Sequence, residues 1–90
     1  MYPLHVAAAQ GNVPQVRNLI RAGYPINEQD DQALATPLHY AAINGHGDVI
    51  RALLELGADQ TIVDDEGKTA YDKAGEVIAD EDLQQIFDSF

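Results

Sequence analysis

The residue types that could perform chemistry in this 90-residue chain are three histidines, His5, His39 and His46, and fifteen aspartates and glutamates. Histidine nitrogens and carboxylate oxygens can bind metal ions or transfer protons, but only where several of them converge on one point. His5 and His39 are 34 residues apart, and nothing at ligand spacing joins them. The histidines therefore predict no metal site.

Nucleophilic and phosphate chemistry have even less support in the sequence. The chain has no cysteine, and Ser89, its one serine, lies one residue from the end. The seven glycines are spread along the chain and form no phosphate-binding loop. We expect no catalytic residue, no cofactor and no enzymatic activity.

Composition indicates one small domain that avoids nucleic acids and membranes. Hydrophobic residues are 46% of the chain, which is too many for a disordered protein. Fifteen acids against five bases give a net charge of −10, which argues against nucleic-acid binding. No apolar run approaches the ~18 residues of a membrane span, and the N-terminus lacks the pattern of a signal peptide. We expect a cytoplasmic protein, with the nucleus as the alternative.

The acids are unevenly distributed. All fifteen lie in residues 28–90, and they concentrate at residues 28–31, 64–66 and 80–82. Two interpretations stay open: the acids keep the protein in solution, or they form a surface that prefers a basic partner.

The elements that must position these side chains follow from an internal repeat. Residues 36–59, TPLHYAAINGHGDVIRALLELGAD, have a near-copy at residues 2–23, YPLHVAAAQGNVPQVRNLIRAG, displaced by 34 residues. Self-similarity at this period predicts a solenoid in which each unit buries its apolar face against its neighbours.

Each unit is predicted to contain two short helices. Thr36 can cap the first helix with its hydroxyl, Pro37 suits the first helical position, and Gly45 ends that helix. A second helix follows, with Asp48 in its first turn and apolar residues through 49–56. Paired alanines in the first helix of each unit, 7–8 and 41–42, allow neighbouring helices to approach closely.

With its TPLH start and this period, the repeat closely resembles the ankyrin repeat. The resemblance implies an all-α solenoid of about three helix-turn-helix repeats joined by β-hairpin-like loops. The repeats would span residues 1–29, 30–62 and 63–90 of one domain. In the last repeat, a helix capped by Asp80 and bearing an apolar stripe would act as a C-terminal cap; the stripe is Leu83, Ile86, Phe87 and Phe90.

The sequence departs from the family pattern at two positions near the start of a repeat. Tyr2 replaces the capping threonine of the first repeat, so we expect a weaker start to that helix. Leu34 stands where the family prefers glycine, at a turn that favours a positive φ.

The resemblance also implies a role. The histidines would be structural, and the domain would bind a protein partner through a concave, mostly acidic face made of loop tips and first helices. Carried over by position, the expected contact residues are Gln10, Gln32, Ala33, Ala35, Tyr40, Ile43, Asn44, Asp65, Glu66 and Lys68. We expect a monomer and a partner with a basic patch. Ile43 is either the nucleus of a binding hot spot or an ordinary exposed apolar residue.

Two other roles stay open. The chain could be a substrate-recruitment or targeting fragment of a larger protein or enzyme, or an architectural spacer that associates with itself.

Overall fold

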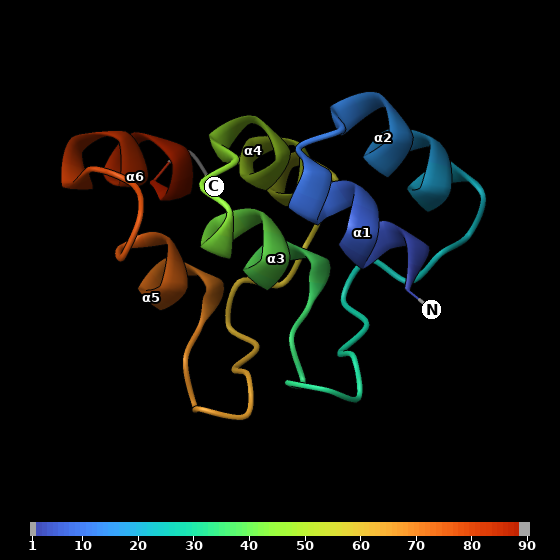
Figure 1. The fold of residues 1–90 in the computed structure, drawn as a ribbon. Helices are drawn as coiled ribbons and strands as arrows, with labels where there is room; N and C mark the ends of the chain where they lie inside the picture. The colour runs from blue at the N-terminus through green and yellow to red at the C-terminus, as the bar shows by residue number, and fades with distance from the viewer. Residues whose placement is uncertain (1, 89–90) are drawn as a thin grey trace.

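Three pairs of antiparallel helices stand in a row in the computed structural model, which describes residues 2–88 (Figure 1). Each pair falls within one of the three predicted repeats, although the exact repeat boundaries remain a prediction. The helices are α1 (Pro3–Gln10), α2 (Val13–Arg21), α3 (Pro37–Ile43), α4 (Gly47–Glu55), α5 (Ala70–Ala74) and α6 (Asp80–Phe87).

The first helices of the pairs form one layer and the second helices another. α3 packs between α1 and α5, while α4 packs between α2 and α6. Ala7, Ala8, Ala41 and Ala42 are all buried where the first helices meet. Their small side chains let the helix backbones approach closely, as the sequence predicts. This stacking of helix pairs confirms the predicted all-α solenoid.

Two long loops, residues 22–36 and 56–69, project from the same side of the helical layers (Figure 1). No strand forms within residues 2–88. Each loop is instead closed by a hairpin-like backbone hydrogen bond, from the N–H of Asp30 to the carbonyl of Ala35 and from the N–H of Asp64 to that of Lys68, both 2.9 Å.

Helix starts follow the predicted capping pattern in the second and third repeats. Thr36 and Thr69 each accept a hydrogen bond from the backbone N–H three residues later. Tyr2 makes no such side-chain cap for α1. Leu34 has a φ of +54°, so the predicted departure from glycine places a leucine in the left-handed region.

The last helix differs from the prediction at its start. Ala79, not Asp80, is the N-cap, and Asp80 is already the first helical residue. The predicted apolar stripe is confirmed at Leu83, Ile86 and Phe87, which are buried. Phe90, the fourth member of that stripe, lies outside the described residues.

Within the described part of the chain, no helix has the length and apolar character needed to cross a lipid bilayer.

Candidate functional site

The two loops are held in shape by buried aspartates. Oδ1 of Asp30 accepts hydrogen bonds from the N–H groups of Ala33 and Ala35, at 3.1 and 3.0 Å. Oδ1 of Asp64 likewise accepts from Glu66 and Lys68, at 2.9 and 3.0 Å. These two carboxylates therefore serve the loop structure, a role that neither interpretation of the acids includes, because each replaces its lost hydration with backbone donors.

The loops are also tied to each other. The side-chain amide of Gln29 donates to the carbonyls of Leu34 at 2.9 Å and Val63 at 3.0 Å. The N–H of Asp65 donates to the carbonyl of Ala33 at 2.9 Å. These bonds make the two loops one platform instead of two independent fingers.

His5 and His39 connect the first helices to this platform, as the structural interpretation predicts. Nε2 of His5 lies 2.8 Å from the carbonyl oxygen of Glu28 and 3.0 Å from that of Ala35. Nε2 of His39 lies 2.9 Å from the carbonyl oxygen of Lys68. Carbonyl oxygens only accept, so in both rings Nε2 carries the proton and Nδ1 of the neutral ring is an acceptor.

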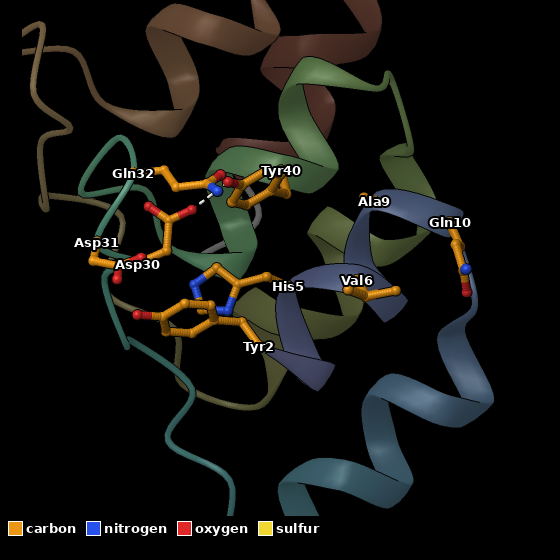
Figure 2. A pocket seen from close by; sticks show the side chains of 9 residues that line it. All are labelled: Tyr2, His5, Val6, Ala9, Gln10, Asp30, Asp31, Gln32 and Tyr40. Carbon is orange, nitrogen blue, oxygen red and sulfur yellow. Dashed lines mark hydrogen bonds between the residues drawn. The ribbon is translucent and has the colours of Figure 1, made fainter.

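A pocket of about 720 Å³ lies between α1, the tip of the first loop and α3 (Figure 2). Its volume falls within the range of small-ligand and anchor pockets, roughly 300–1,000 Å³. The residues that line it are Tyr2, His5, Val6, Ala9, Gln10, Asp30, Asp31, Gln32 and Tyr40.

Three rings form one wall of the pocket. Tyr2 and Tyr40 each meet the ring of His5 edge to face, with centroids 5.0 and 5.5 Å away. The Tyr40 hydroxyl donates a hydrogen bond to Oδ2 of Asp30, drawn as the dashed line in Figure 2. The pocket therefore combines aromatic faces with carboxylates.

The surroundings of Asp30 keep its carboxylate ionised. Burial alone would raise the pKa of Asp30, but hydrogen bonds from Tyr40 and from the N–H groups of Ala35 and Ala33 hold that pKa below its ordinary value. The same bond to Asp30, together with burial, raises the pKa of Tyr40 to about 12. Burial and then the charge of Asp31 raise the pKa of Tyr2. Asp30 is thus an anion at neutral pH, and both tyrosines are neutral.

The structure places the predicted contact residues unevenly. Gln10, Gln32 and Tyr40 all line the pocket. Ile43 is 45% exposed one helical turn beyond Tyr40, and the exposed Asn44 donates through Nδ2 to the carbonyl of Tyr40.

One predicted contact residue is wrongly assigned. Ala35 is only 3% exposed, because its position just before the capping Thr36 turns it into the core, so its side chain is unavailable to a partner. Ala33 is half-buried, and Asp65 is exposed on the second loop.

The two remaining predicted contacts take part in ion pairs. Glu66 pairs with Lys73, and Lys68 pairs with Glu76 at 3.6 Å. Asp64, Asp65 and Glu66 could bring their carboxylates within 4.8 Å of one another. However, Lys73 also approaches Asp64 at 3.7 Å, so a lysine already pairs with two of the three carboxylates and we assign no metal to this cluster.

Six lining residues of the pocket are absent from the predicted contact residues: Tyr2, His5, Val6, Ala9, Asp30 and Asp31. The repeat register contained a signal for two of them. Val6 and Tyr40 are 34 residues apart, as are Ala9 and Ile43, so each occupies the first-helix position of a predicted contact residue.

Comparison with known proteins identifies the repeats. A family model described as ankyrin repeats, in three copies, matches residues 3–78. Protein phosphatase 1 regulatory subunit 27 of Homo sapiens is 33% identical over 87 residues, covering 97% of this chain and 53% of that protein. Protein phosphatase 1 regulatory subunit 12A of Mus musculus is 41% identical over 80 residues, covering 89% of this chain and 7% of that protein. Ankyrin repeat domain-containing protein 40 of Mus musculus is 37% identical over 65 residues, covering 72% of this chain and 18% of that protein.

The chain thus spans about half the length of the first of these relatives and much less of the other two.

Proposed function

Because this chain belongs to the ankyrin repeat family, whose repeats are protein-interaction modules, we propose that it is a non-catalytic adaptor that binds a basic surface of a partner protein. The binding face would be the loop platform and the adjoining first helices. We place such an adaptor in the cytoplasm or nucleus, as a monomer without cofactor or metal.

The charge of the loop platform is the observation that carries this proposal. Residues 22–36 and residues 56–69 each have a net charge of −3, so the two loops carry −6 of the net −10 of the chain. No ion pair within residues 2–88 involves Glu28, Asp31 or Asp65. Charge of one sign on a rigid platform speeds encounter with an oppositely charged partner and favours its correct orientation.

Apolar contacts beside these charges would supply the affinity. Ile43 and Val6 are exposed, at 45% and 46%, on the first helices that border the loops. Apolar and aromatic residues at the centre of an interface typically provide most of its binding energy, while the charged rim contributes selectivity. A platform of three repeats would offer an interface at or below the standard size, which is about 800 Å² per partner.

Partner capture from a lysate with two matched double variants tests this proposal. Ile43→Arg with Asp65→Lys changes the proposed face. Val77→Arg with Glu81→Lys makes the same charge changes at exposed residues outside the two loops and the first helices. We expect proteins that the wild type and the Val77/Glu81 variant retain and the Ile43/Asp65 variant loses, with retention weakening as salt rises.

Equal retention by both variants would show that the proposed face is wrong. Phosphatase catalytic subunits are one class to probe among the captured proteins, because two of the relatives are named as phosphatase regulatory subunits.

A second role, recruitment within a longer protein, is favoured by the lengths of the relatives, of which this chain matches only a part. Sequencing the complete reading frame would separate it from a free-standing adaptor. A neighbouring catalytic domain would establish recruitment, and its absence would exclude it.

A further inference from the structure

We propose that the pocket between α1 and the first loop binds an arginine side chain of a partner protein. This inference rests on the proposed function, since it names the group by which a basic partner would be anchored.

The lining of the pocket suits a planar cation. The aromatic rings of Tyr2 and Tyr40 flank His5, and their faces can stack on a guanidinium group. Asp31 is exposed at the rim, and the Tyr2 hydroxyl points toward it (Figure 2). The side-chain oxygen of Gln32, also at the rim, can accept a further N–H.

The charges of the lining residues indicate that the pocket binds a cation. No lysine or arginine lines the pocket, whereas Asp30 and Asp31 do. Asp30 keeps its negative charge because hydrogen bonds from Ala33, Ala35 and Tyr40 stabilise the carboxylate. A pocket with two carboxylates and no internal cation repels anions and attracts a cation.

Arginine fits better than lysine for a geometric reason. A guanidinium group is flat, so it can stack on a tyrosine face and still present several N–H donors in its own plane to Asp31 and Gln32. An ammonium group is a strongly hydrated point charge and gains less from an aromatic wall. The exposed side chain of Val6 and the half-buried Ala9 can contact the methylene stem behind the charged group.

The strongest sign of a binding role is Tyr2 itself. In the second repeat, the equivalent position is Thr36, whose hydroxyl lies 2.7 Å from Nδ1 of His39. With Tyr2 in that position, Nδ1 of the 4%-exposed His5 has no hydrogen-bond partner within the described residues, and α1 has no side-chain cap. The tyrosine therefore weakens the fold locally while it supplies one aromatic wall of the pocket, which is the pattern of a residue kept for binding.

Tyr2→Thr tests binding without weakening the fold. Threonine restores a cap and a partner for His5, so this variant should be at least as stable as the wild type. Asp31→Asn removes one charge from the pocket rim. Asp82→Asn is its matched control, because Asp82 is also an exposed aspartate but lies on α6, outside the loop platform and the first helices.

The experiment is an NMR titration of the ¹⁵N-labelled chain with three blocked pentapeptides, Gly-Gly-X-Gly-Gly, in which X is arginine, lysine or citrulline. Citrulline has nearly the shape of arginine without its charge. We expect saturable shifts around residues 2–10 and 30–32 with the arginine peptide, weaker ones with lysine and none with citrulline. Tyr2→Thr and Asp31→Asn should each weaken binding of the arginine peptide by about tenfold, the scale of a cation–π contact or an ion pair in a partly desolvated site. Asp82→Asn should leave that binding unchanged.

The proposal is overturned if the arginine peptide gives no saturable shift, if the lysine or citrulline peptide binds as tightly, or if Asp82→Asn weakens binding as much as Asp31→Asn. Its failure is distinguishable from failure of the proposed function. A partner captured by the wild type and retained equally by Tyr2→Thr would refute the arginine pocket and leave the adaptor role standing. Binding of the arginine peptide without any captured partner would refute the adaptor role and leave the arginine pocket standing.

Discussion

Replacing Thr36 by valine should cost more stability than replacing Thr69, although both threonines cap the first helix of a repeat. Oγ1 of Thr36 accepts from the N–H of His39 at 3.3 Å and also lies 2.7 Å from Nδ1 of the same residue. Because Nε2 of His39 donates to the carbonyl of Lys68, Nδ1 must accept, and the Thr36 hydroxyl is the donor. Valine keeps the shape of the side chain and removes both bonds.

The magnitude follows from those two bonds. Loss of a capping bond costs about 1 kcal/mol, and loss of a buried bond between hydroxyl and imidazole costs about 1 kcal/mol more. Thr36→Val should therefore lower the free energy of unfolding by about 2 kcal/mol. Thr69 accepts a capping bond from the N–H of Asp72 at 3.2 Å but is followed three residues later by an aspartate, not a histidine, so Thr69→Val should cost only the capping share, about 1 kcal/mol.

Urea unfolding of the two variants and the wild type measures this difference. The midpoint should fall about twice as far for Thr36→Val as for Thr69→Val, with the slope unchanged, because a local change leaves the surface exposed on unfolding nearly constant. Equal losses in the two variants would refute the claim that the threonine–histidine bond stabilises the second repeat.

Three further predictions concern the pocket and a helix end. Asp30→Asn should lower the free energy of unfolding at neutral pH by about 1–2 kcal/mol, since charge-assisted bonds become neutral ones. Because folding lowers the pKa of Asp30, its ionised carboxylate stabilises the fold above the ordinary pKa of 3.8, and this stabilisation is lost as the pH falls through the lower pKa of the folded protein. The urea midpoints of wild type and variant should therefore converge in acid. Tyr40 should ionise near pH 12 in an absorbance titration, and Asp30→Asn should return its pKa toward 10.0. The stabilisation that goes with this raised pKa is complete below the ordinary pKa of 10.0 and is lost as the pH rises through about 12. Gly11→Ala should lower the thermal midpoint more than Gly45→Ala, although both glycines have a positive φ. A Cβ at Gly11 would lie 2.8 Å from the His46 ring, whereas a Cβ at Gly45 would have no surrounding atom within 4 Å. Equal shifts of the midpoint would contradict this packing.

The fold was predictable because its determinants are local and repeated. A 34-residue register, a Thr-Pro start and glycine ends specify each helix pair from residues close together in sequence. The buried apolar stripe of the last helix, Leu83, Ile86 and Phe87, could likewise be read from its spacing. The start of that helix was misplaced by one residue because alanine gives no capping signal, while the adjacent Asp80 gives a strong one.

The pocket was less predictable because its walls come from segments that meet only in the folded chain. Tyr40 and Asp30 are ten residues apart, and nothing in their spacing indicates a shared hydrogen bond. Buried aspartates cannot be told from solvated ones by composition, since the backbone donors that satisfy Asp30 appear only once the loop closes. Ala35 shows the opposite error: its loop position suggested exposure, but closure of the same loop buries it.

The departures from the repeat pattern are informative because both lie on the face proposed for binding, Tyr2 at the pocket and Leu34 on the first loop. Tyr2 removes a cap, and Leu34 holds a left-handed backbone that typically costs a branched residue about 1–2 kcal/mol. Neither is compensated by burial, since Leu34 is 49% exposed and Tyr2 lines an open pocket. The interior positions of the same repeats, such as the paired alanines, keep the pattern and are buried. Fold stability alone would favour threonine and glycine at the two departing positions, so the physical account that fits both residues is contact with a partner, whose binding energy offsets the local loss.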